Sequence, residues 1–190
     1  MIAICIGHSR KINNRTEGGA WSERLQKNEH SFNSVVAKKL AEILTANGIP
    51  HFTLNIYEGN GYGAAMRWAA QQIKARGAKL AIELHYNAAS ASARGHEWLH
   101  WHSSKNGKAL AESFRFTFSQ DYPHHKDRGL KSITSQDRGG EFLRLTHCPS
   151  VILEPFFGSS AEDSAAFSGH DGAAALASTY AASLLRYLKK

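Results

Sequence analysis

Short apolar runs alternate along the chain with longer segments in which apolar residues recur every three or four positions. The short runs predict β-strands and the longer periodic segments predict helices. Strands are expected over residues 2–7, 51–57, 79–85, 95–101 and 150–154. Helices are expected from Glu29 to a stop at Gly48, and over about 64–76, 106–120, 140–146 and 160–187. This alternation predicts an α/β fold: a single twisted, mostly parallel β-sheet flanked by helices on both faces, in three layers.

Two polar segments interrupt this pattern, residues 9–28 and residues 121–138, and both are expected to be loops. A loop as long as the first is usually functional or disordered in a compact domain. Neither segment has the composition of a flexible linker, and the chain shows no internal repeat. We therefore expect one domain spanning residues 1–190.

Charge and composition limit the classes of function and partner that the chain can have. The formal net charge of +7 favours anionic partners such as nucleic acid, acidic lipid or acidic cell-wall polymer. Nucleic acid is not expected, because the chain has neither an RNP-like aromatic motif nor a long basic helix stripe. No apolar run approaches the roughly 18 residues of a membrane span. The first residues, MIAICIGHSRK, lack the features of a signal peptide, so we expect synthesis in the cytoplasm.

Polar side chains end three of the predicted strands. The stretch KLAIELHYNAA runs from apolar residues into His85, the first strand ends at His8, and the strand SVILE ends at Glu154. In α/β sheets, functional sites form beyond the carboxyl ends of the strands. We therefore expect these three residues to lie at one site.

Two histidines and a carboxylate would suit a zinc ion, because a catalytic zinc takes three protein ligands and one water. His8 and His85 supply two ligands, and Glu29 is a candidate third at the positive end of its helix. Glu154 is then a candidate proton acceptor for a zinc-activated water. The alternative for Glu154 is a strand-end acid paired with a surface Lys or Arg, and the alternative for Glu29 is an ordinary helix-start acid.

A second histidine motif competes with this site. Residues 96–100 read His-Glu-Trp-Leu-His, which matches the HExxH motif of zinc proteases. That motif requires a helix, whereas this aromatic, turn-bounded segment favours a strand. In a strand His96 and His100 would lie about 13 Å apart, too far to share an ion. His124 and His125 lie in a polar segment and are expected to face solvent or substrate.

Taken together, these motifs resemble the type-3 class of zinc-dependent N-acetylmuramoyl-L-alanine amidases, the cell-wall hydrolases of bacteria and their phages. The resemblance covers most of the chain and rests on an ordered set of segments: Gly7-His8, EHSFNSVVAKKLAEILTANG (29–48), AIELHYNA (81–88), Gly95 with Glu97, RGLK (128–131) and VILEPFF (151–157).

The resemblance implies hydrolysis of the amide between N-acetylmuramic acid and the L-alanine of the stem peptide. It implies one Zn²⁺ held by His8, Glu29 and His85, with Glu154 as general base. Its implied partner is peptidoglycan, and we expect a monomer. Candidates for binding substrate carboxylates are Arg67, Arg128 and Lys131, and the alternative for each is a solvated or helix-paired role. Candidates for supporting the ligands are Glu83 and Asn87.

The chain departs from the family pattern in its first motif, which reads GHSRK where the family has GHGG, and in the length of the segment before Glu29. Glu23 therefore remains an alternative ligand. A zinc carboxypeptidase and a catalytically inactive wall-binding module are the alternative functions. The lack of a recognisable export signal or wall-binding domain favours a phage or prophage endolysin that reaches periplasmic or cell-wall peptidoglycan by phage-type release.

Overall fold

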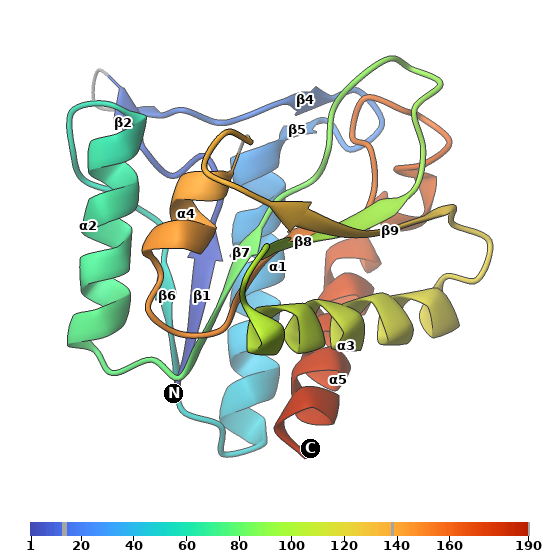
Figure 1. Cartoon of the computed structure of the whole chain (residues 1–190). Helices are drawn as coiled ribbons and strands as arrows, with labels where there is room; N and C mark the ends of the chain where they lie inside the picture. Colours follow the sequence, from blue (N-terminus) through green and yellow to red (C-terminus); the bar gives the residue numbers. More distant parts are fainter. Residues whose placement is uncertain (13–14, 138, 190) are drawn as a thin grey trace.

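The computed structural model describes residues 1–12, 15–137 and 139–189, and its centre is a six-stranded sheet (Figure 1). The strands lie in the order β6-β1-β7-β10-β8-β9. Four of them run parallel, β8 runs antiparallel to β10, and β9 is parallel to β8. Their bounds are β1 Ile2–Ile6, β6 His51–Leu54, β7 Leu80–Leu84, β8 His96–Trp101, β9 Asp127–Ile133 and β10 Ser150–Glu154.

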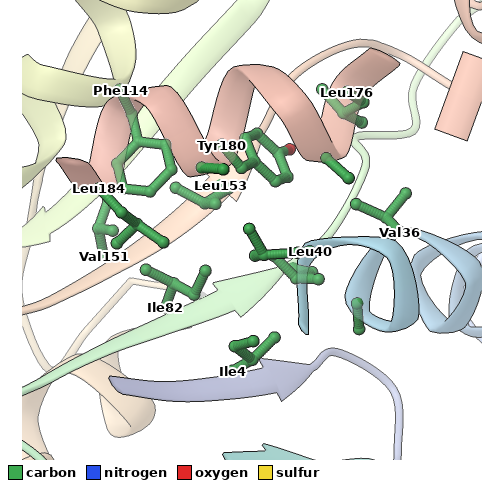
Figure 2. Packing of buried hydrophobic residues seen from close by; sticks show 14 of the residues in the cluster. Ile4, Val36, Leu40, Ile82, Phe114, Val151, Leu153, Leu176, Tyr180 and Leu184 are labelled. Atoms are coloured by element: carbon green, nitrogen blue, oxygen red, sulfur yellow. The ribbon is translucent and has the colours of Figure 1, made fainter. Parts of the chain in front are cut away.

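Helices cover both faces of the sheet, which confirms the predicted three-layer α/β/α class. One face carries α1 (Glu29–Ala46), α3 (Lys105–Asp121) and α5 (Gly172–Leu188), and the other carries α2 (Tyr62–Ala75) and α4 (Gly140–Leu145) (Figure 1). Alternate strand residues supply the two cores, because successive side chains point to opposite faces. Figure 2 shows the first core, in which sheet residues such as Ile4 and Leu153 pack against Leu40 of α1 and Tyr180 of α5.

The register of the parallel strands aligns their carboxyl ends. Ile6 of β1 pairs with Leu84 of β7, and Leu84 pairs with Leu153 of β10. The residues that follow these positions therefore lie together at the same end of the sheet, toward the top of Figure 1. None of the described helices is both long and apolar enough to cross a membrane.

The first helix begins and ends where its sequence predicts. The side chain of Asn28 caps α1 by accepting a hydrogen bond from the Ser31 backbone N–H at 2.8 Å. After the last turn, Gly48 adopts φ +67°, a left-handed conformation that glycine tolerates and that commonly ends helices. These two signals place Glu29 in the first turn of α1, beside the carboxyl edge of the sheet.

Four expectations about individual segments were wrong. Residues 127–133 form the edge strand β9 within the expected loop. Residues 9–28 contain two small hairpins, β2 (Lys11–Ile12) with β3 (Arg15–Thr16) and β4 (Trp21–Ser22) with β5 (Lys27–Asn28). The last helix begins at Gly172, because the preceding residues form turns and a short 3-10 helix, Ala165–Phe167, that buries Phe167. The second strand, expected to reach residue 57, ends at Leu54.

Candidate active site

His8 and His85 follow adjacent parallel strands and lie close together beyond the carboxyl ends of these strands. Their rings lie edge to face with centroids 5.2 Å apart. Gly7 makes this approach possible, since a Cβ atom at that position would lie 2.2 Å from the His85 ring. The chain then turns sharply at His8, which has φ +56°, an uncommon conformation for a residue other than glycine.

Glu29 completes a compact group with these two histidines. One carboxylate oxygen, Oε2, lies 3.2 Å from Nε2 of His8, and the other, Oε1, lies 2.8 Å from Nδ1 of His85. One candidate ligand atom from each residue lies within 4.8 Å of the other two. The arrangement is a possible metal-binding triad, made of the residue types that zinc prefers.

The Glu29 carboxylate is buried and held by backbone donors. Its exposed fraction is 3%, and it accepts hydrogen bonds from the N–H groups of Ala20 and Tyr86 at 3.3 and 3.1 Å. Burial alone would raise the pKa of Glu29, but its contacts with His8 and His85 outweigh burial and lower the pKa to about 2. Glu29 is therefore a fixed anion at neutral pH.

His85 is oriented from its other ring nitrogen. Nε2 lies 3.3 Å from Oε2 of Glu83, and the hydroxyl of Tyr57 donates to Oε1 of the same carboxylate at 3.0 Å. Burial alone would lower the pKa of His85, but its contacts with Glu29 and Glu83 raise it well above the usual value. In metal-ligating histidines, the ring nitrogen that does not face the metal is typically bound to a carboxylate, which fixes the orientation of the ring.

Glu154 ends β10 next to this group, opposite Glu97 in the antiparallel pair with β8. Its Oε2 atom is buried and has no hydrogen-bond partner among the described residues. Burial raises the pKa of Glu154 to about 8 against the attraction of His85, and the negative charges of Glu29 and Glu97 add to this rise. A carboxyl group with a pKa near neutrality and a free oxygen suits a general base or acid.

Two basic residues of β9 reach the same part of the site. Arg128 Nε donates to Oε2 of Glu97 at 2.7 Å, and Lys131 Nζ lies 3.9 Å from the same oxygen. The Arg128 guanidinium lies over the ring of Phe157, 5.0 Å from its centroid. Asn87 donates to Oε1 of Glu97 at 2.8 Å. Three sequence candidates therefore converge on Glu97, beside Glu154.

The contacts recorded for two other candidates are with residues outside the triad. Arg67 is exposed on α2, where its charge acts on Glu141 at the start of α4. Glu23 is exposed and accepts hydrogen bonds from the Trp21 indole at 2.9 Å and from the Gln26 amide at 3.1 Å. Among the described residues, the potential metal-binding group contains Glu29 and does not contain Glu23.

The HExxH string forms strand β8, as predicted, and does not build a second metal site within the described residues. His96 is fully buried beside Phe118, with ring centroids 4.6 Å apart, and accepts a hydrogen bond from the Trp98 indole at 3.0 Å. Glu97 points to the opposite face of the strand, toward Glu154. His124 is exposed as expected, whereas His125 is half-buried, with Nδ1 3.5 Å from Asp163.

Three residues of the site escaped the sequence analysis. Tyr57 fixes Glu83, and Gly19 leaves room for the triad, since a Cβ there would lie 2.7 Å from both Glu29 Oε2 and His8 Cδ2. The buried carboxylate of Asp163 accepts hydrogen bonds from the backbone N–H groups of Gly95 and Phe157 at 3.1 and 2.6 Å. The glycine pair at 18–19 was the one local signal available, because adjacent glycines often mark a close backbone approach.

The fold and the site together define a class of protein. A mostly parallel α/β/α sheet carries two histidines and a carboxylate at its carboxyl edge, with a second glutamate of raised pKa beside them. Such a group of residues could hold a metal ion and would suit a hydrolase.

The family model for N-acetylmuramoyl-L-alanine amidase (Amidase_3) matches residues 2–186, so the chain belongs to this family. It is a peptidoglycan hydrolase that cleaves the amide bond between N-acetylmuramic acid and L-alanine. No curated protein sequence matches the chain closely enough to count as a relative.

Solved structures share the fold over nearly the whole chain. The N-acetylmuramoyl-L-alanine amidase AmiC2 of Nostoc punctiforme is 20% identical, with a TM-score of 0.80 and coverage of 100% of this chain and 98% of that one. The catalytic domain of the amidase CwlV from Bacillus (Paenibacillus) polymyxa var. colistinus is 20% identical, with a TM-score of 0.80 and coverage of 99% and 98%. The catalytic domain of the CD27L endolysin, which targets Clostridia difficile, is 22% identical, with a TM-score of 0.78 and coverage of 97% and 96%.

Proposed function

We propose that the chain is a zinc-dependent amidase in which His8, Glu29 and His85 hold one zinc ion. The observation that carries the proposal is the position of Glu29, whose two oxygens each face a ring nitrogen of a different histidine at 3.2 and 2.8 Å. Two imidazoles and one carboxylate are a ligand set of catalytic zinc sites. A cation in this space would displace the ring proton with which His85, whose pKa is raised by Glu29 and Glu83, meets the charge of Glu29, so binding would release a proton.

Glu154 acts as the general base in this proposal. When bound, zinc polarises the amide carbonyl and lowers the pKa of water. The unpartnered Oε2 of Glu154 accepts the proton of the attacking water. The same carboxyl group then donates this proton to the amine of L-alanine as the amide bond breaks. Burial keeps its pKa close to the range in which both transfers proceed at neutral pH.

The neighbours of the triad hold it in place for this reaction. Glu83 fixes the ring of His85 through Nε2, and Tyr57 in turn fixes Glu83. Asn87 and Glu97 support the wall of the site beside Glu154. Arg128 and Lys131 bind carboxylates of the stem peptide, and Glu97 holds both cations on the side of the site where Glu154 lies. Arg67, on α2, is the third proposed substrate contact.

The biological role that fits best is that of a phage or prophage endolysin acting on cell-wall peptidoglycan as a monomer. One solved structure with the same fold is an endolysin catalytic domain. The net charge of +7 suits an anionic cell wall. In this role the protein is made in the cytoplasm and reaches the wall through phage-type release, with peptidoglycan rather than nucleic acid as its partner.

Substitutions separate metal binding from proton transfer. We expect Glu154→Gln to keep its zinc and to lose activity by about 10²- to 10⁴-fold, because it removes only the proton acceptor. His8→Ala, Glu29→Ala and His85→Ala should each lower zinc content, measured by inductively coupled plasma mass spectrometry of the purified protein. Glu23→Ala is the control and should keep full occupancy. Zinc loss in Glu23→Ala but not in Glu29→Ala would overturn the ligand assignment.

A further inference from the structure

The hairpin β4–β5 is built onto the proposed zinc site. Ala20, which precedes β4, donates its N–H to Glu29 Oε2 at 3.3 Å and accepts the Glu29 N–H at 2.9 Å. The Tyr86 hydroxyl, next to His85, donates to the carbonyls of Ala20 and Lys27 at 2.7 and 3.1 Å. The hairpin is therefore a wall of the site, and its residues keep a fixed position relative to the triad.

Trp21 is the exposed aromatic residue of this wall. Its exposed fraction is 51%, whereas that of the next residue, Ser22, is 0%, so the indole points away from the core. Two residues before it, Gly19 lies against Glu29 and His8. Trp21 thus follows the backbone that encloses the triad, and it pairs across the hairpin with Asn28, the residue before Glu29.

Polar contacts hold the indole in place. Its N–H donates to Oε1 of Glu23 at 2.9 Å, and the Gln26 amide donates to Oε2 of Glu23 at 3.1 Å and to its carbonyl at 2.8 Å. Trp21 belongs to neither hydrophobic core cluster. A large aromatic side chain that is exposed and yet oriented loses little conformational entropy when a ligand covers it.

We propose that Trp21 stacks on a sugar ring of the glycan strand and so forms a saccharide subsite beside the zinc site. The proposal rests on the proposed position of zinc. The scissile carbonyl is joined to its sugar by a lactyl group, so the pyranose ring lies only a few bonds from the triad when the amide is in place. The apolar C–H face of a pyranose packs on an indole, while its hydroxyl groups stay hydrated or meet polar neighbours. Glu23, the alternative ligand considered from the sequence, then serves to orient Trp21.

Binding of peptide-free glycan strands tests the subsite without catalysis. Titration of chelator-treated protein by calorimetry should give an affinity that falls about tenfold in Trp21→Ala. Trp21→Phe should retain part of the affinity, and Glu23→Ala should lie between Trp21→Ala and the wild type. The matched control is Phe116→Ala, because Phe116 on α3 is similarly exposed at 49% but stacks under Arg186. Equal affinity in Trp21→Ala and wild type, or no glycan binding by the wild type, would overturn the proposal.

Kinetics with two substrates supply a second test. The ratio of kcat/KM for a muramyl peptide to kcat/KM for a sugar-free lactoyl-L-alanyl peptide should fall about tenfold in Trp21→Ala, with the loss in KM. An equal loss with both substrates would show that Trp21 supports the site without contacting sugar. A wild type that binds glycan through Trp21 but cleaves neither substrate would contradict the proposed function and leave the saccharide subsite intact.

Discussion

Glu29 joins three parts of the molecule at the scale of a single residue. Its backbone begins α1, its N–H is paired with Ala20 of the hairpin, and its carboxylate contacts residues that follow β1 and β7. A buried carboxylate is costly unless it is paired and hydrogen-bonded, and Glu29 has both kinds of partner. Loss of this one side chain would therefore remove the acceptor that faces one ring nitrogen of each histidine and two backbone N–H groups.

Gly19 provides a test of how tightly this residue is enclosed. Gly19→Ala would place a methyl group 2.7 Å from Glu29 Oε2 and from His8 Cδ2, in addition to the strain of φ +72°. We expect it to weaken zinc binding, measured by competition with a chelator. Gly48→Ala is a matched control, because Gly48 has a similar φ of +67° and no neighbouring atom within 4 Å.

The control should lose about 1–2 kcal/mol in the free energy of unfolding, measured in urea, and should keep its zinc affinity. Equal zinc affinities in the two variants would contradict the close packing of Gly19 against the triad.

The site residues that the sequence placed correctly are those at the ends of predicted strands. His8 and His85 follow strands, and Glu154 ends a strand, whose carboxyl ends are aligned, and the predicted start of the helix put Glu29 beside them. Tyr57 and Asp163 could not be found in this way. Their partners Glu83 and Gly95 lie 26 and 68 positions away, and no periodicity or motif links residues across such distances.

At the scale of elements, the inner strands could be predicted from the sequence, whereas the edge strand β9 could not. The strands β1 and β7 are buried at every position, which is the signature of a sheet covered on both faces. The edge strand β9 has only one buried position, Ile133, and so carries no apolar pattern. The last helix was expected too early because the alanines and polar residues before Gly172 suit a helix locally, whereas burial of Phe167 and the left-handed Gly169 impose turns.

Burial of His96 on β8 leads us to predict that the protein loses stability in acid. Burial lowers the pKa of His96 from 6.5 to about 4. Between these values the unfolded chain binds a proton that the folded chain does not, so the free energy of unfolding falls as the pH falls. The loss over this window is about 3 kcal/mol for His96, and it is complete near pH 4.

Urea unfolding at pH 7 and pH 4 checks this, with His96→Gln as the comparison, because glutamine can still accept the Trp98 hydrogen bond but does not titrate. The wild type should lose more stability than the variant between the two pH values. Parallel losses in the two proteins would show that His96 does not contribute to acid instability.

At the scale of the whole molecule, charge should affect how the enzyme meets its substrate. A net charge of +7 attracts an anionic polymer over distances comparable to the Debye length, which shrinks from about 30 Å at 0.01 M salt to about 10 Å at 0.1 M. We expect kcat/KM on intact cell walls to fall across this range, measured by the clearing of a wall suspension. The control is a small neutral muramyl peptide, for which kcat/KM should change much less. A similar salt response for both substrates would exclude long-range attraction.

In the proposed function, a metal held by His8, Glu29 and His85 supports cleavage between muramic acid and L-alanine. Mass spectrometry of purified peptidoglycan after digestion, with and without a chelator, tests it most directly. We predict free stem peptides that begin with L-alanine, lost on chelation and restored by zinc. Peptides cut internally, or the same products in the presence of chelator, would contradict it.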